Sequence, residues 1–268
     1  MRTKSQMAPR RAGASTLAIV TIALLPVASF GAAAAGSRPN FSGVWFSVQN
    51  THHENISAET MFKKATGIKA PPGGWPHVKP HYAESFKAAI RRAEEADARG
   101  VVLADTETQC RPDGMPKMMR AILPIEVVQS AKQVMVVTEE MSQVRRIYLD
   151  EKMPPAEEIS PSYNGYSVGH WDGDTLIIDT IGIRGDVSFM FLPNSGKMKL
   201  TERMRLQNPN LLELTINLED PEVLEKPYRL TWTYTRDDSH KILEYVCDNN
   251  RYAPGKDDAA TLNIDIPQ

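Results

Sequence analysis

Short runs in which apolar and polar residues alternate occupy most of the chain after residue 124. Alternation with a period of two predicts β-strands that bury one face, and turn-forming residues between the runs favour antiparallel pairing. About eight to ten such strands are enough to close an up-and-down barrel. The expected strands and hairpins are Phe41–Val48, Ile125–Gln129, Gln133–Glu139, Gln143–Asp150, the hairpin Tyr166–Gly182, Lys199–Gln207 with Leu211–Leu218, and Tyr228–Arg236 with Lys241–Cys247.

One segment has a helical pattern instead. From Tyr82 to Arg99, the residues Tyr82, Phe86 and Ile90 fall on one stripe, charged residues fill the rest, and Gly100 follows as a C-terminal stop. We therefore expect a single amphipathic helix at 82–99. It would pack on the outside of the sheet or across the mouth of the barrel.

The hairpin Tyr166–Gly182 offers candidate catalytic groups. A turn at Asp172-Gly173 would place Tyr166, His170 and Asp179 on one face among apolar residues. In a pocket, His170 would shuttle a proton, Asp179 would orient it or act as a second base, and Tyr166 would stabilise oxyanion charge. This hypothesis depends on the strand register.

Two further charged residues are candidates for the same site. Glu202 lies on an otherwise apolar strand face, where a carboxylate must find a partner or keep its proton. The alternative is that Glu202 reaches water at a strand end. Arg146 could complete the site, although the pattern leaves open whether Arg145 or Arg146 points inward, and a surface salt bridge is the commoner explanation.

Methionine and aromatic residues could line a binding site for a small hydrophobic or aromatic molecule. The turn-rich segment 106–119 contains Met115, Met118 and Met119, which supply pliable apolar surface. They would serve either as core filler or as the rim of a pocket. Further candidate ligand-binding residues on the strands are Trp45, Tyr148, Trp232 and Tyr234.

The N-terminus predicts export. A basic start with Arg2, Lys4, Arg10 and Arg11 precedes the apolar run Leu17–Phe30 and the small residues at 33–35, as in a signal peptide that covers residues 1–35. An uncleaved anchor is the alternative. Cleavage removes four positive charges and lowers the formal net charge from −2 to −6, which argues against nucleic acid as a partner.

We accordingly expect a periplasmic or secreted protein. Residues 36–268 would form one barrel domain with no membrane span and with a polar tail at 248–268. Its oligomeric state is left open. In such a compartment the two cysteines, Cys110 and Cys247, favour a disulfide over free thiols.

Other chemistries have weaker support. His77 and His81 have a spacing that could bind a metal on a helix, but Pro80 disfavours this, so no metal is expected. No cofactor is expected either, because the chain has no G-x-G-x-x-G and no phosphate-binding loop. Ser167 sits in a G-x-S-x-G match, but in a hairpin, not in the strand-to-helix turn of a nucleophile elbow.

Two resemblances bear on the fold. Gly43-Val44-Trp45 resembles the G-x-W signature of lipocalins and other calycins, in which the tryptophan closes one end of a barrel around a small hydrophobic ligand. The blocks CRPDGMPKMM, VRRIYLDE, GYSVGHWDGDTLIIDT and EYVCDNN are similar to those of a group of uncharacterised secreted bacterial proteins. Departures from that pattern are Tyr166, where a small residue is usual, and Glu151, where glycine is frequent. The second resemblance implies fold and location without an activity.

Two functions follow from these patterns. The first is an exported barrel that binds a small hydrophobic or aromatic molecule in its interior. The alternative is a cofactor-independent lyase, isomerase or hydrolase that uses the His170 group on such a molecule. The position of His170, inside or outside the barrel, discriminates between them.

Overall fold

The computed structural model describes residues 38–48 and 74–247, apart from positions 102, 105, 107 and 121, together with the backbone of 252–254 and 260–262. The expected signal peptide at 1–35 and most of the expected tail lie outside the described residues. Everything described below belongs to the unit that spans Gly36–Gln268.

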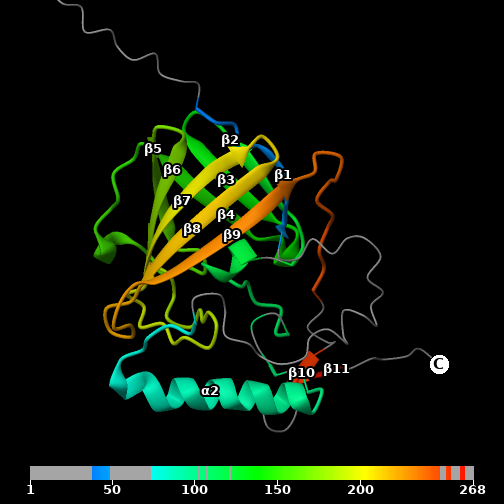
Figure 1. The fold of residues 1–268 in the computed structure, drawn as a ribbon, viewed down its shortest axis with the longest axis vertical. Coiled ribbons are helices and arrows are strands. Elements are labelled where there is room, and N and C mark those ends of the chain that lie inside the picture. Colours follow the sequence, from blue (N-terminus) through cyan, green and yellow to red (C-terminus); the bar gives the residue numbers. More distant parts are fainter. Residues whose placement is uncertain are drawn as a thin grey trace, which may run out of the picture. The chain divides into compact units, whose positions relative to one another are not determined.

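Nine strands form a closed barrel, in which each strand pairs with its neighbours in the chain and β9 returns to β1 (Figure 1). The predicted barrel is therefore confirmed, and most strand bounds agree with the alternation to within two residues. The strands are β1 (Gly43–Ser47), β2 (Ile125–Gln129), β3 (Gln133–Thr138), β4 (Val144–Leu149), β5 (Tyr166–Asp172), β6 (Thr175–Ile181), β7 (Lys199–Asn208), β8 (Leu211–Glu219) and β9 (Tyr228–Arg236).

One neighbouring pair, β4 and β5, is parallel, with Ile147 opposite Ser167. All other pairs are antiparallel. A closed ring with an odd number of strands needs at least one parallel pair, because directions cannot alternate all the way round. The segment between Leu149 and Tyr166, with the short 3-10 helix η4 (Ala156–Glu158), makes this crossover. The strictly antiparallel order expected from the spacing thus fails at this one place.

The prediction of a final hairpin was wrong. The segment Lys241–Cys247 forms no strand, and β9 pairs with β1 and β8 instead. Both edges of β9 are thereby used, so no edge is left for a tenth barrel strand. Within that segment Leu243 and Val246 are 63% and 77% exposed. Further along, β10 (Tyr252–Pro254) and β11 (Ala260–Leu262) pair as a separate two-stranded sheet.

Trp45 on β1 lies opposite Arg236, the last residue of β9. Its side chain is completely buried, and the Arg236 guanidinium stacks on the ring at 4.5 Å from the centroid. Gly43 has a φ of 137°, which residues with a side chain rarely adopt, so the backbone requires glycine there. A Cβ atom would also lie 2.4 Å from Oδ1 of Asp238, an exposed side chain that can move aside. The G-x-W residues thus anchor β1 against the residues at and after the end of β9.

The helix α2 spans Pro80–Ala98, two residues earlier at its start than expected, because Pro80 occupies the first turn, where its missing N–H costs nothing. Phe86 belongs to the hydrophobic core, and Tyr82 and Ile90 pack against it. Backbone bonds join the chain just before α2 to the loop between β8 and β9, from Lys79 N to Val223 O and from Glu225 N to His77 O. The apolar stripe of the helix therefore contributes to the hydrophobic core, as the pattern predicted.

Candidate functional site

A bidentate ion pair between Arg145 and Glu202 lies inside the barrel. Arg145 on β4 donates from Nη1 to Glu202 Oε1 on β7 at 3.0 Å and from Nη2 to Oε2. The two side chains are 1% and 0% exposed. Such a pair is tolerated in an apolar core only when the remaining donors and acceptors are also satisfied.

Two hydroxyl groups accept further hydrogen bonds from the Arg145 guanidinium. Arg145 donates from Nε to Ser167 Oγ at 3.2 Å and from Nη2 to Thr180 Oγ1 at 2.9 Å. The two hydroxyl oxygens are themselves 2.9 Å apart, and both side chains are buried on facing positions of β5 and β6. The four side chains form one closed network, which we call the Arg145 network. Of the outcomes that the sequence left open for Glu202, the structure thus shows the one with a buried partner, and Ser167 serves as a hydrogen-bond partner.

The methionine segment lies against this interior. Met115, together with Met118 and Met119 on η2 (Lys117–Arg120), is fully buried in the hydrophobic core. The backbone N of Met115 donates to Tyr163 O at 3.0 Å. We call residues 115–119 the methionine plug, because it occupies core space with side chains that belong to no strand.

Tyr234 ties the plug to the barrel. Its phenol on β9 donates to the carbonyl oxygen of Met119. Burial raises the pKa of Tyr234 well above its usual value, and the negative charge of Glu202 adds to the effect while Arg145 opposes it. This coupling places Tyr234 within electrostatic reach of the Arg145 network.

Trp232, two residues before Tyr234 on β9, faces the same core. It is 4% exposed, and Phe189 meets it edge to face with ring centroids 6.1 Å apart. Of the predicted ligand-binding residues, the structure thus brings Met115, Met118, Met119, Trp45, Trp232 and Tyr234 into one buried cluster. Tyr148 is the exception, because it lies on the outer side of β4.

The predicted catalytic face of the hairpin points outward. The turn residues are Gly173 and Asp174, so His170 pairs with Ile177 and Val168 with Asp179. The register differs by two residues from the expected one, which changes the cross-strand partners but not the face. His170 is exposed, and Asp179 accepts a hydrogen bond from Thr201 Oγ1 at 2.8 Å. The expectation that these groups face the interior is therefore wrong.

Tyr166 and Arg146 also lie on the outer surface. Tyr166 stacks on Tyr148 with ring centroids 5.1 Å apart, and its phenol donates to Glu151 Oε2 at 3.5 Å. Desolvation, followed by the negative charge of Glu151, raises the pKa of Tyr166. Arg146 is exposed, so Arg145 is the arginine that points inward. The outer groups do not meet Glu202, and the proposed acid–base constellation does not assemble.

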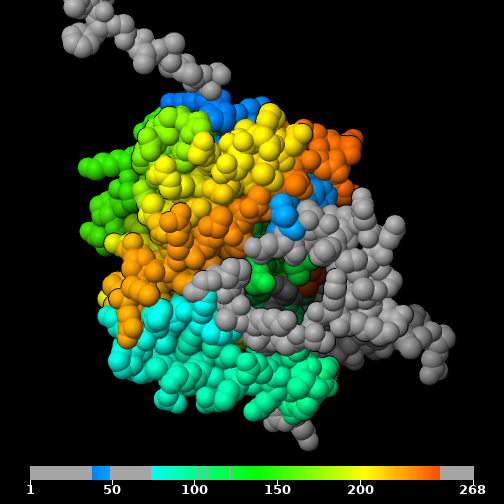
Figure 2. Space-filling model, viewed as in Figure 1, coloured from blue at the N-terminus to red at the C-terminus, as the bar shows by residue number. Residues whose placement is uncertain are grey.

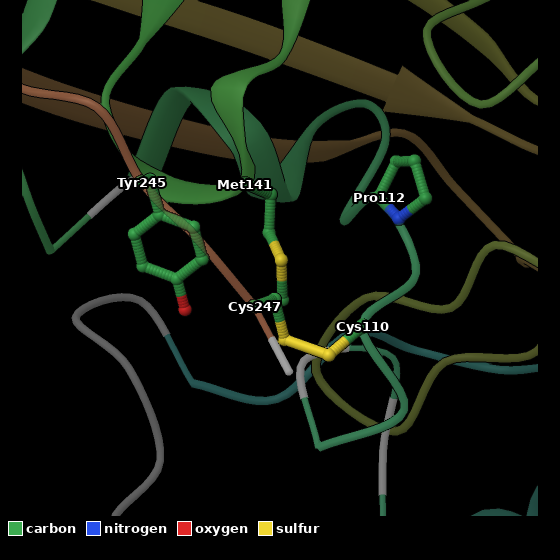
Figure 3. A pocket seen from close by; sticks show the side chains of 5 residues that line it. All are labelled: Cys110, Pro112, Met141, Tyr245 and Cys247. Atoms are coloured by element: carbon green, nitrogen blue, oxygen red, sulfur yellow. A yellow bond between two sulfur atoms is a disulfide. The ribbon is translucent and has the colours of Figure 1, made fainter. Parts of the chain in front are cut away.

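The predicted disulfide between Cys110 and Cys247 is present, with Cα atoms 5.5 Å apart. It borders a surface hollow of about 230 Å³, which Pro112, Met141 and Tyr245 also line (Figure 3). Met141 belongs to the short 3-10 helix η3 (Glu140–Ser142), whereas the other lining residues belong to no helix or strand.

Neither a metal-binding cluster nor a membrane-spanning helix is found among the described residues. His77 and His81 are both exposed, and no group of three His, Cys, Asp or Glu side chains in the described ranges could hold a metal ion. Within the same part of the chain, no helix is long and apolar enough to span a membrane.

Arg145 and Thr180 are the site residues that sequence reasoning missed. A signal for Arg145 existed, since it alternates with Ile147 and Leu149, which are buried. Thr180 similarly alternates with Ile178 and Leu176. Thr180 lies on the face of the hairpin opposite to His170, and the face with His170 was the one expected to point inward.

No family model matches the chain, and the search of curated proteins finds no significant match. The protein is therefore defined by its fold and its interior: a closed, mainly β barrel with a buried ion pair and a methionine plug.

Proposed function

We propose that this protein binds a small hydrophobic or aromatic molecule inside the barrel, in space that the methionine plug occupies when no ligand is bound. The observation that carries the proposal is the burial of Met115, Met118 and Met119 against Trp232 and Tyr234. Methionine side chains are unbranched and polarisable, and proteins use them where an apolar surface must adapt to different partners. A flat apolar molecule can replace their contacts.

The Arg145 network gives such a site its polar end. Ligand sites are mostly apolar with a few fixed polar groups, and here the phenol of Tyr234 and the hydroxyls of Ser167 and Thr180 are the fixed groups. When the plug moves, Met119 no longer accepts the Tyr234 hydrogen bond. The freed phenol then donates to a carbonyl or hydroxyl oxygen of the ligand.

A thermal-shift and tryptophan-fluorescence screen against aromatic and terpenoid compounds tests this proposal. Met118→Ala removes plug volume, so it should raise the affinity for a ligand about five- to ten-fold. The matched control is Met135→Ala, because Met135 lies on the outer side of β3. Equal affinities in the two variants, or no ligand for either, would contradict interior binding.

The enzymatic alternative has no comparable support. Its proton shuttle, His170, is exposed, and Asp179 is held by Thr201 on the outer surface. His170→Ala should therefore leave ligand binding unchanged. A substrate that the wild type converts and His170→Ala does not would restore the lyase, isomerase or hydrolase hypothesis.

We also propose export and a relation to calycins. The Cys110–Cys247 disulfide supports an oxidising compartment, and Trp45 at the end of the barrel beside Gly43 supports the G-x-W relation. Mass spectrometry of the protein from cell fractions tests export. An N-terminus at Gly36 in the periplasmic or secreted fraction supports it, and an intact N-terminus in the cytoplasm contradicts it.

A further inference from the structure

A second candidate site lies on the surface, at the end of the barrel where β1 begins and β9 ends. It is a groove of about 500 Å³ at the turn between β7 and β8. Three segments that are distant in sequence form its walls: Asn40 before β1, the turn Asn208–Asn210, and Arg236 with Asp238 at and after the end of β9. Leu206 supplies an apolar surface. In Figure 2 the yellow and orange segments of the chain adjoin at the upper end of the view.

The asparagine side chains leave hydrogen-bond donors available. Asn40 Oδ1 accepts from Ser42 N, and Asn208 Oδ1 accepts from Asn210 N, both at 2.9 Å. These bonds use the amide oxygens to hold the turns. Among the described residues, neither NH₂ group has a hydrogen-bond partner, and the side chain of Asn210 has none on either atom. Two of the three amide groups in the groove, those of Asn40 and Asn208, are thus held in place by bonds from backbone N–H groups.

Arg236 and Asp238 make the groove nearly neutral. Arg236 donates from Nη1 to Ser42 O at 2.8 Å and from Nη2 to Asn40 O at 3.0 Å. Its Nε atom is buried and has no hydrogen-bond partner. The Asp238 carboxylate lies 3.8 Å from Nη1 and is 60% exposed. Because the two charges are adjacent and opposite, the groove favours neither anions nor cations.

We propose that this groove binds a neutral polyhydroxylated molecule, a mono- or disaccharide. Sugar hydroxyls both donate and accept, so they can donate to Asp238 and to the Asn210 amide oxygen and accept from the asparagine NH₂ groups. The C–H face of a sugar ring packs on Leu206 and Pro209. A volume of about 500 Å³ lies within the range of small-molecule sites, about 300 to 1,000 Å³.

The test is an NMR titration of the side-chain amide signals with D-glucose, maltose and cellobiose, with acetate and methylammonium as charged probes. We expect saturable shifts of the Asn40, Asn208 and Asn210 signals with at least one sugar and none with the charged probes. Asn210→Ala removes a side chain that bonds to no described residue. It should therefore lower the sugar affinity about three- to ten-fold without unfolding the protein.

Asn217→Ala on β8 is the matched control, because Asn217 is partly exposed and does not line the groove. It should leave the sugar affinity unchanged within about two-fold. The proposal is overturned if no sugar gives saturable shifts, if acetate or methylammonium binds instead, or if Asn217→Ala weakens binding as much as Asn210→Ala. The outcome of the sugar titration does not depend on ligand binding inside the barrel, because interior binding is followed separately through the NMR signals of Met115, Met118 and Met119.

Discussion

Arg145 and Glu202 stand 57 residues apart in sequence and form a bidentate ion pair that is almost completely shielded from water. Four strands, β4 to β7, contribute to the network around it. Because every donor and acceptor is close to a partner, the pair is stable in place, whereas either residue alone would be an uncompensated buried charge.

Removal of one partner should therefore be costly. We expect Glu202→Ala to lower the free energy of unfolding by about 3–5 kcal/mol, as measured by urea denaturation. The double variant Arg145→Met with Glu202→Leu should regain most of that loss, because two apolar side chains leave no charge unpaired.

The exposed pair Arg205–Asp174 is the matched control. Its atoms approach to 3.3 Å, but the two side chains are 52% and 62% exposed. Asp174→Ala should cost less than about 1 kcal/mol. A Glu202→Ala loss no larger than that of Asp174→Ala would show that the core pair contributes little.

Tyr234 should make stability fall at high pH. Its pKa in the folded protein is raised above the ordinary value of 10.0, so the unfolded chain loses this proton first as the pH rises. Above pH 10 the unfolded state therefore binds fewer protons than the folded state, and the free energy of unfolding decreases by about 1.4 kcal/mol per pH unit. Below pH 10 the contribution of Tyr234 is fully present.

Tyr234→Phe should flatten this decline, as followed by urea unfolding at a series of pH values. Tyr228→Phe serves as a comparison. Burial also raises the pKa of Tyr228, but that side chain is 9% exposed against 1% for Tyr234, so its effect should be smaller. An unchanged high-pH slope in Tyr234→Phe would show that its phenol ionises as readily folded as unfolded.

Gly43 should tolerate alanine less well than Gly173. Both have positive φ angles, but the 61° of Gly173 lies in the left-handed α region that other residues can adopt, whereas the 137° of Gly43 lies outside it. A Cβ atom at Gly43 also meets Oδ1 of the exposed Asp238 side chain, whereas one at Gly173 meets nothing within 4 Å. We expect Gly43→Ala to cost about 2–4 kcal/mol and Gly173→Ala about 1 kcal/mol in thermal or urea unfolding. Equal costs would mean that the backbone conformation of Gly43 strains alanine no more than that of Gly173 does.

The disulfide should stabilise the protein without building the barrel. It closes a loop of 137 residues, so Cys110→Ser with Cys247→Ser should lower the free energy of unfolding by about 2–5 kcal/mol. The barrel has its own closed hydrogen-bond ladder, so the β-sheet circular dichroism should remain. Loss of the β-sheet signal in the double variant without denaturant would show that the barrel needs the disulfide in order to form.

The sequence predicted the nine barrel strands and the residues that share a face of each, because alternation reports both, although it also predicted a strand at Lys241–Cys247 that does not form. For the same reason it indicated Glu202 as a carboxylate on an apolar face, but it left open whether Glu202 is buried or reaches water at a strand end. Alternation does not report which face lies inside when both carry apolar residues. On β5 and β6, Val168 and Ile177 lie outward while Leu176 and Ile178 lie inward, so His170 could be placed on either side.

Contacts between distant segments could not be predicted from the alternation of apolar and polar residues either. The parallel pairing of β4 with β5 and the closure of β9 on β1 depend on chain direction and on competition for strand edges, which local alternation does not encode. The pairing of Arg145 with Glu202 could not be predicted from alternation either, because it depends on the barrel fold, which places β4 and β7 around the same interior.

The most direct test of interior binding is a methyl NMR titration with ¹³C-methionine-labelled protein and a compound from the screen. The signals of Met115, Met118 and Met119 should shift and saturate together, while the chemical shift of Met135, on the outer face, should not change. Shifts at Met135 with unchanged plug signals would contradict the account, because the ligand would then bind outside the barrel.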